Sequence, residues 1–171
     1  KLGFVKTNPM AIPMLIPNEV GGNIAISFGL HGPVQSVSTA CSSGTDAMGV
    51  ALEMVRSGRL DCCLTGGAEA TICQYGIVAF EVLHALSTGF DDDPTKASRP
   101  FDKKRNGFVM GEGAGMFMFE EYEHAKARGA KIYAEVAGYG ASCDGYHLTS
   151  PNPDGVVGSM CMSRAMKDAG I

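Results

Sequence analysis

The stretch STACSSGTDAMGVALEMVRSG, residues 38–58, places Cys41 between a short β-like run and a helical pattern. A cysteine thiolate is a strong nucleophile, and the first turn of a helix stabilises an anion through its unpaired N–H groups and the positive end of its dipole. The position of Cys41 therefore suits nucleophilic attack. The alternative is structural, because free cysteine is also a common small hydrophobic residue of protein interiors. The neighbouring residues alone leave both interpretations open.

Two elements are needed to position Cys41. Before it, residues 34–40 (VQSVSTA) alternate in polarity and include valine and threonine, which predicts a short strand. After it, apolar residues recur at helical spacing over residues 47–55 until Gly58, which predicts a helix. Gly44 leaves room for another backbone or a substrate to approach this helix. The sequence thus predicts a strand-to-helix turn at Cys41.

The remaining chain alternates between strand and helix patterns. Residues 60–70 predict a strand buried on both faces, and together with the strand before Cys41 they predict a crossover in a parallel sheet. Residues 75–87 predict a helix, residues 108–142 predict strand, glycine turn, strand, helix and strand, and residues 156–169 predict a last helix. The fold class is therefore α/β.

Composition excludes several classes of protein. The 171 residues, of which 45% are hydrophobic, are enough for one domain or part of one. A net charge of −4 without any block of Lys and Arg argues against nucleic-acid binding. The six cysteines and four histidines show no metal-ligand spacing, so we expect reduced thiols in the cytoplasm and no metal site. Residues 20–45 contain no Asp, Glu, Lys or Arg but are too polar for a membrane span, so we expect them in a buried interior.

Two long blocks, residues 38–70 and residues 85–155, resemble the β-ketoacyl-acyl-carrier-protein synthases in order and spacing. These are condensing enzymes of the thiolase-like superfamily, and the resemblance is greatest to the synthase II group of bacterial fatty-acid synthesis. It extends over essentially the whole chain and implies the thiolase-like layered α/β fold. Residues 1–129 are then the later part of the N-terminal half, and residues 130–171 are the start of the C-terminal half. We therefore expect the chain to be the central piece of a longer protein.

The resemblance also implies roles for individual residues. Cys41, in TACSSG, is implied as the nucleophile that takes an acyl chain from carrier protein, with its backbone N–H as one oxyanion donor. Phe80, in GIVAF, is implied as a wall of the acyl pocket, and His147 and Thr149, in DGYHLTSP, as a lining near the entrance. The two catalytic histidines of the family lie in motifs of the type N-x-H-G-T-x-T and K-x-x-x-G-H, which we expect after Ile171. His147 is neither of them.

The activity implied is a decarboxylative Claisen condensation of the acyl-enzyme with malonyl-carrier protein in fatty-acid elongation, an acyltransferase reaction that needs no cofactor or metal. The implied partners are acyl carrier protein, loaded with acyl or malonyl groups, and a second copy of the chain in a homodimer. We expect neither nucleic acid nor membrane as a partner. Two alternatives remain. The first is a polyketide ketosynthase, because that group shares the ACSS motif. The second is that the 171-residue chain by itself is a binding or dimerisation fragment, which we expect to be inactive.

Overall fold

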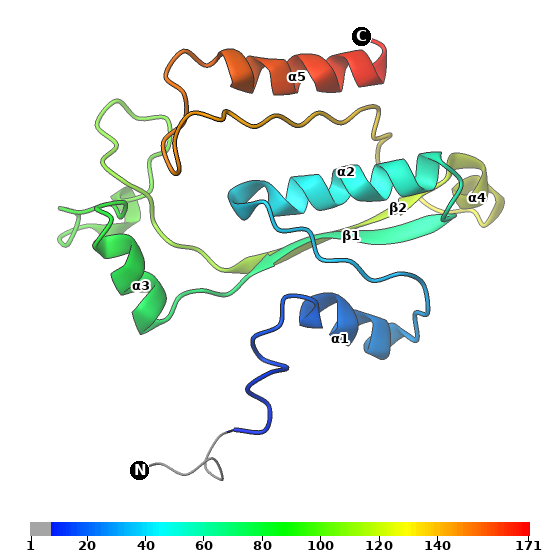
Figure 1. Ribbon diagram of the computed structural model, residues 1–171, viewed down its shortest axis with the longest axis horizontal. Coiled ribbons are helices and arrows are strands. Elements are labelled where there is room, and N and C mark those ends of the chain that lie inside the picture. Colours follow the sequence, from blue (N-terminus) through cyan, green and yellow to red (C-terminus); the bar gives the residue numbers. More distant parts are fainter. Residues whose placement is uncertain (1–7) are drawn as a thin grey trace. The chain divides into compact units, whose positions relative to one another are not determined.

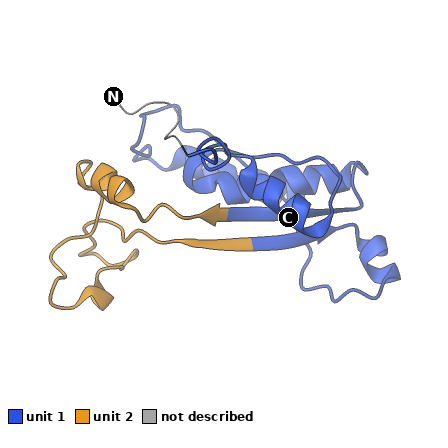
Figure 2. Ribbon diagram, turned by 90° about the horizontal axis from the view of Figure 1, so that it is seen from below, with its two compact units in different colours: residues 1–67, 116–171 blue, residues 68–115 orange. Residues whose placement is uncertain are grey.

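The computed structural model describes residues 8–171 and contains both helices and strands, as the sequence predicts (Figure 1). In chain order they are helix α1 (Glu19–Phe28), the 3-10 turn η2 (Ala40–Ser42), helix α2 (Ser43–Arg56), strand β1 (Cys62–Glu69), helix α3 (Gln74–Glu81), the 3-10 turn η3 (Pro94–Lys96), strand β2 (Gly113–Glu120), helix α4 (Tyr122–Ala127) and helix α5 (Val156–Ala169). The chain divides into two compact units (Figure 2). One comprises residues up to Gly67 together with Met116–Ile171, and the other comprises Ala68–Gly115.

Strands β1 and β2 form a two-stranded sheet. They run in opposite directions, as the arrows in Figures 1 and 2 show. Helix α2 ends before Gly58, whose φ of 68° is left-handed and easily adopted by glycine. The predicted strand over residues 60–70 and the helices after Cys41 and over residues 156–169 are confirmed. The predicted burial of this strand on both faces is wrong, because within β1 Thr65 is buried whereas Cys62 and residues 67–69 are exposed.

The predicted strand before Cys41 is not formed in the described part of the chain, and so the expected parallel crossover to β1 is absent there as well. Residues 34–39 have no neighbouring extended segment with which to exchange backbone hydrogen bonds among residues 8–171. An extended segment becomes a strand only when its N–H and C=O groups are paired in a ladder. The alternating pattern therefore identified a segment that has no sheet partner among residues 8–171.

The end of the predicted region 108–142 also lacks a strand, because side chains rather than a second strand bind its backbone. Tyr139 N–H donates to Asp168 Oδ2 at 2.9 Å, and Arg56 donates to the Ala137 carbonyl at 2.5 Å. Cys161 Sγ donates to the Gly140 carbonyl at 3.0 Å. These side chains come from α2 and α5, so residues 137–142 are satisfied from two helices without joining a sheet.

Two glycines allow α5 to lie directly on this segment. A Cβ atom on Gly138 would collide with the Ala165 carbonyl oxygen, and one on Gly140 would collide with the Cys161 carbonyl oxygen. An ion pair of 2.8 Å between Arg56 and Asp168 links α2 to α5. Close backbone contact and this ion pair together fix α5 in the first unit.

The second unit, Ala68–Gly115, has its own packing. Cys73 Sγ caps α3 by accepting the Gly76 N–H at 3.4 Å. The helix ends at Glu81, earlier than the predicted residue 87, because His84 takes a left-handed φ of 53° that no α-helix accommodates. Residues Leu86 and Phe108 then form an isolated parallel bridge, in place of the strand predicted at the start of residues 108–142.

Few side chains of the described residues are buried, which contradicts the prediction of a buried interior for residues 20–45. The buried apolar side chains are Ala51, Leu52 and Ala125. In α1, Ile26 is 82% exposed and Phe28 is 73% exposed. Their apolar face has no covering element among residues 8–171, and burial requires one. None of the helices in the described residues combines the length and the apolar character needed to cross a membrane.

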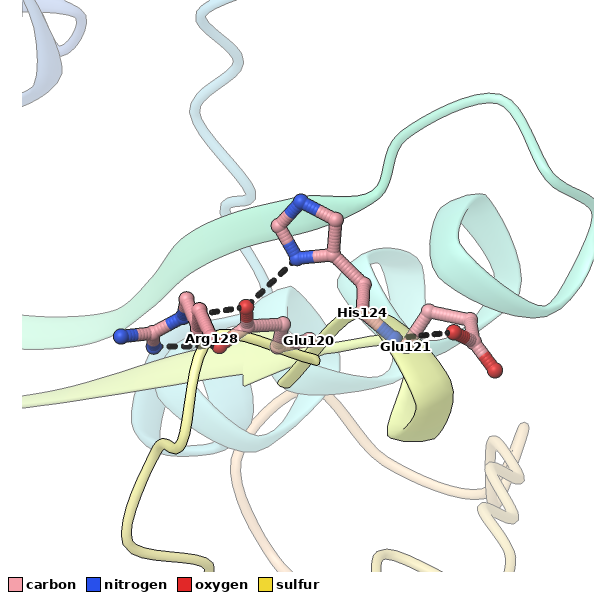
Figure 3. A network of polar contacts seen from close by, with 4 residues as sticks. All are labelled: Glu120, Glu121, His124 and Arg128. Carbon is pink, nitrogen blue, oxygen red and sulfur yellow. Dashed lines mark hydrogen bonds and ion pairs between the residues drawn. The ribbon is translucent and has the colours of Figure 1, made fainter. Parts of the chain in front are cut away.

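Glu120 joins β2 to α4 through three charged contacts (Figure 3). Arg128 donates to both carboxylate oxygens, at 2.7 and 2.6 Å, and His124 Nδ1 lies 2.6 Å from Oε1. The Arg128 guanidinium is the main reason why the pKa of Glu120 falls from 4.5 to about 2. Beside it, Glu121 caps α4 by accepting the His124 N–H at 2.8 Å.

Gly140→Ala should destabilise the fold, because the new methyl group meets a backbone carbonyl of α5 that cannot turn away. We expect the free energy of unfolding in urea to fall by about 1–3 kcal/mol. The control is Gly158→Ala on the same helix, where a Cβ has nothing within 4 Å. That variant should gain about 0.5–1 kcal/mol from helix propensity. Equal effects of the two substitutions contradict the predicted contact.

Glu120→Gln should remove part of the acid sensitivity of the chain. A carboxyl whose pKa is lowered on folding contributes stability above its unfolded pKa and loses it as the pH falls. The wild type should therefore lose stability between pH 4.5 and about 2 more steeply than the variant. Chemical denaturation at a series of pH values measures this. Glu123→Gln is the control, because Glu123 makes only an exposed pair with Lys126 at 3.6 Å. Parallel pH profiles for wild type and Glu120→Gln exclude this role.

Candidate active site

Cys41 lies in the 3-10 turn η2, two residues before the first residue of the 14-residue helix α2, and its side chain is exposed. The predicted helix after Cys41 therefore begins where the sequence placed it. The unpaired N–H groups of this terminus and the positive end of the helix dipole stabilise an anion nearby. The location suits a reactive thiol, and the Cys41 side chain is not packed among the described residues.

The residue before Cys41 is strained. Ala40 has a φ of 53°, one of two positive values among the described non-glycine residues. A left-handed conformation costs a residue with a Cβ about 1–2 kcal/mol. Such residues persist where surrounding contacts determine the backbone, and they concentrate at functional sites.

Hydroxyl groups close the turn around this strained residue. Thr39 N–H donates to Ser43 Oγ at 2.9 Å, and Ser43 Oγ donates to the Ala40 carbonyl at 2.6 Å. Ser42 Oγ lies 2.9 Å from the Thr39 carbonyl and 3.0 Å from Thr39 Oγ1. The residues on both sides of Cys41 are thereby joined to each other.

The Asp46 carboxylate, in the first turn of α2, accepts hydrogen bonds from several side chains near Cys41. Asp46 Oδ2 accepts from Ser42 Oγ at 2.9 Å, and Oδ1 accepts from the Tyr139 hydroxyl at 2.5 Å. Hydrogen bonds from Thr39, then Tyr139 and Ser42, lower the pKa of the Asp46 carboxyl. The hydrogen bond between the Tyr139 hydroxyl and Asp46 raises the pKa of Tyr139 to about 12. Both shifts favour an ionised Asp46 that accepts and a neutral Tyr139 that donates.

Sequence reasoning missed Asp46 and Tyr139 as members of the site. A signal for Asp46 was present, because it is the first Asp, Glu, Lys or Arg after Glu19, and acidic residues favour the first turn of a helix. Tyr139 gave no local signal, since its hydroxyl reaches Asp46 across 93 positions of sequence.

Helix α2 also approaches β1 closely near its start. A Cβ on Gly67 would lie 3.3 Å from Gly44 Cα, and one on Gly44 would lie 3.7 Å from Gly67 Cα. Gly44 therefore makes room for a backbone, one of the two possibilities that the sequence left open. Further along α2, a Cβ on Gly49 would lie 2.5 Å from Tyr139 Cζ, so the ring rests on the helix backbone. A cleft of about 340 Å³ opens beside Gly49 and Tyr139 but does not include Cys41.

His147 and Thr149 lie in the exposed loop before α5. His147 Nδ1 accepts the N–H groups of Thr149, at 3.2 Å, and of Ser150, at 3.1 Å. A neutral His147 in this arrangement carries its proton on Nε2. Within residues 8–171 no hydrogen bond joins either residue to the Cys41 turn, so their lining role stays a prediction.

Phe80 belongs to the second unit, in α3, and is 37% exposed. Its ring meets Phe108 edge to face, with centroids 5.1 Å apart and planes at 82°. This contact gives the ring a fixed orientation, and its role as a pocket wall stays a prediction. Nearby in the same unit, Glu112 Oε1 accepts the Ile72 N–H at 2.8 Å, so this carboxylate has a structural contact.

No group of three or more His, Cys, Asp or Glu side chains suited to a metal ion occurs in the described residues. The exposed Cys41, its strained turn and the Asp46 carboxylate are thus the chemical features that the described part of the first unit brings together.

Comparison with known proteins identifies the family. Residues 2–125 match the model of the β-ketoacyl synthase N-terminal domain. The 3-oxoacyl-[acyl-carrier-protein] synthase 2 of Vibrio cholerae is 51% identical over 97% of this chain and 40% of its own length. The enzyme of the same name from Staphylococcus aureus is 48% identical over 97% of this chain and 41% of its length. The chain therefore spans about 40% of the curated relatives that it matches.

Solved structures agree with this result. A type II polyketide synthase ketosynthase, bound to its acyl carrier protein, is 40% identical with a TM-score of 0.92, over 96% of this chain and 40% of that one. A β-ketoacyl synthase from Burkholderia phymatum is 38% identical with a TM-score of 0.88, over the same shares of the two chains. The thiolase-like α/β fold is confirmed, and the chain belongs to the β-ketoacyl synthase family.

Proposed function

We propose that the whole protein is a β-ketoacyl-[acyl-carrier-protein] synthase of fatty-acid elongation and that Cys41 carries its acyl chain. The observation behind this is the exposed Cys41 thiol in a strained turn at the start of α2, in a chain of the β-ketoacyl synthase family. Nucleophilic catalysis needs an accessible side chain held in a defined orientation, and this turn supplies both.

The chemistry has two half-reactions. First, the Cys41 thiolate adds to the carbonyl carbon of an acyl thioester on carrier protein, and the tetrahedral intermediate then expels the thiolate of the carrier. Next, malonyl-carrier protein loses its carboxylate as carbon dioxide, and the electron pair left on C2 attacks the acyl-cysteine carbonyl. The new C–C bond gives a second tetrahedral intermediate, and its collapse breaks the bond to Cys41 Sγ. These steps balance without an oxidant or a reductant.

The other site residues have supporting roles in this proposal. The Cys41 backbone N–H is one donor to the oxyanion of the tetrahedral intermediate. Phe80 lines the acyl pocket, while Thr149 and His147 line its entrance, where His147 Nε2–H is a donor because Nδ1 already accepts two N–H groups. The histidines that polarise the malonyl thioester belong to other parts of the protein, since residues 1–171 contain neither of their motifs. In this proposal residues 1–129 are the later part of the N-terminal half, and residues 130–171 are the start of the C-terminal half.

A polyketide ketosynthase is the second candidate, favoured by the structure that has a TM-score of 0.92. The 51% and 48% identities to 3-oxoacyl-[acyl-carrier-protein] synthases 2 favour fatty-acid synthesis over it. The products distinguish the two. Supplied with acyl- and malonyl-carrier protein and no reductase, a fatty-acid synthase gives one extended β-ketoacyl product, whereas a polyketide ketosynthase adds further units to the unreduced chain.

Acyl carrier protein is the proposed partner in both half-reactions, consistent with the solved ketosynthase that is bound to its own carrier protein. We propose a cytoplasmic homodimer that uses no nucleic acid and no membrane. Residues 34–39 suit the dimer contact, because their backbone has no sheet partner among the described residues and a second copy supplies one.

Cys41→Ala in the whole protein should abolish acyl transfer, because no other group then forms the thioester. Mass spectrometry after brief iodoacetamide treatment should find Cys41 modified before Cys63 and Cys161. Burial raises the pKa of the Cys63 thiol, and the Cys161 thiol donates to a carbonyl. Cys63→Ala is the control and should retain transfer. An active Cys41→Ala enzyme, or equal labelling of all six cysteines, refutes the assignment.

The 171-residue chain alone should give no β-ketoacyl product, because it lacks the partner histidines.

Val37→Asp should disrupt the proposed dimer by placing a charge in the contact. Analytical ultracentrifugation of the whole protein should then give a smaller particle than the wild type. Tyr133→Asp is the control, because Tyr133 is 85% exposed and lies outside residues 34–39. A wild type that sediments as a monomer, or an intact Val37→Asp dimer, is the result that excludes this contact.

A further inference from the structure

We propose that Asp46 is a positioning residue for Cys41 and that the Tyr139 hydroxyl holds the Asp46 carboxylate in place. The inference rests on the proposed function of Cys41. Asp46 itself makes no chemical step. It fixes the two ends of the turn that carries the nucleophile.

Hydrogen bonds from both sides of Cys41 meet at Ser42 and Asp46. Thr39 lies two residues before Cys41, and Ser42 lies one residue after it. Ser42 Oγ contacts Asp46 Oδ2 at 2.9 Å and Thr39 Oγ1 at 3.0 Å. One carboxylate therefore braces both flanks of Cys41.

The backbone between those flanks is strained. Ala40, with its φ of 53°, is held in a conformation that an alanine adopts only under constraint. If the brace is weakened, the turn has a lower-energy conformation available with φ below zero. Cys41 is the next residue, so this relaxation moves its thiol.

Tyr139 supplies the rigidity of this brace. Tyr139 donates its hydroxyl to Asp46 at 2.5 Å and its backbone N–H to Asp168 of α5 at 2.9 Å. Two residues earlier, the Ala137 carbonyl accepts from Arg56 at the other end of α2. The Tyr139 ring also rests directly on Gly49. Residues 137–139 are thus fixed to both ends of α2 and to α5, which makes Tyr139 a firm support for Asp46.

Positioning by Asp46 is distinct from electrostatic activation. An ionised Asp46 near the start of α2 repels a thiolate in the same turn and does not assist its formation. If Asp46 activated the thiol, Asp46→Asn would slow the alkylation of Cys41. If Asp46 only positions the turn, Asp46→Asn does not slow it. Alkylation by iodoacetamide requires only an accessible thiolate. Acyl transfer requires alignment of the thiol with a bound thioester and an oxyanion donor, where small displacements have large effects on rate.

The test compares these two reactions of Cys41 in the whole protein. In Asp46→Asn and in Tyr139→Phe we expect kcat for acyl transfer to fall about 10-fold to 100-fold with KM within about 2-fold. The rate of Cys41 alkylation across pH 6–10 should be unchanged, or raised in Asp46→Asn. The matched controls are Glu53→Gln, an exposed carboxylate on the same helix, and Tyr122→Phe, a tyrosine that is 58% exposed. Both should transfer acyl groups at the wild-type rate.

A double variant tests the link to strain. Glycine adopts a positive φ without penalty, so Ala40→Gly combined with Tyr139→Phe should recover part of the acyl transfer that Tyr139→Phe loses. Absence of recovery overturns the role assigned to Ala40.

The outcomes are separable. Wild-type kcat in both Asp46→Asn and Tyr139→Phe overturns the positioning role while leaving Cys41 as nucleophile. A parallel loss of alkylation and acyl transfer also overturns it, because a general collapse of the site affects both reactions. Failure of the wild type to transfer acyl groups through Cys41 overturns the proposed function instead. If Asp46→Asn does not fold, Tyr139→Phe, which removes one oxygen atom, decides the question alone.

Discussion

The hydrogen bond between the Tyr139 hydroxyl and the Asp46 carboxylate is the contact on which the arrangement around Cys41 depends. On one side it reaches the strained turn through Ser42, and on the other it reaches α5 through the Tyr139 backbone and Asp168. A charged acceptor strengthens such a bond, since hydrogen bonds to ionised groups contribute about 1.5–3 kcal/mol, compared with about 1 kcal/mol between neutral groups. That contribution is of the same order as the cost of a left-handed alanine, so the strain can be sustained.

The backbone groups of residues 137–142 form hydrogen bonds with side chains, whereas those of a strand form them with neighbouring strands. Their polar backbone groups bind Arg56, Asp168, Cys161 and Arg164, which come from α2 and α5. Backbone N–H and C=O groups outside a sheet pair with side chains or water, and here two helices provide the side chains. The consequence is that the two helices and the segment between them form one hydrogen-bonded assembly within the first unit, although the loss of a single side chain leaves a backbone group without its partner.

The sequence predicted the local elements of the fold well and their pairing less well. Gly58 and Gly170 marked the ends of α2 and α5 because glycine takes the left-handed φ that follows a helix. The turn at Cys41 was predicted from the change between alternating and helical spacing. Residues 34–40 were predicted as a strand but form none in the described part of the chain, because pairing depends on a partner that periodicity does not reveal. Within the site, Cys41 was found from its own surroundings, whereas the Asp46–Tyr139 pair joins positions 93 residues apart and has no local signature.

The contact between Gly49 and Tyr139 has a consequence for how this protein changes over generations. A Cβ at position 49 would lie 2.5 Å from Tyr139 Cζ, so a side chain there requires the ring to move. Substitutions at positions 49 and 139 are therefore coupled. A larger residue at 49 displaces the Tyr139 ring, and with it the hydroxyl group that donates to Asp46. Among related sequences, glycine at 49, tyrosine at 139 and aspartate at 46 should accordingly appear and disappear together.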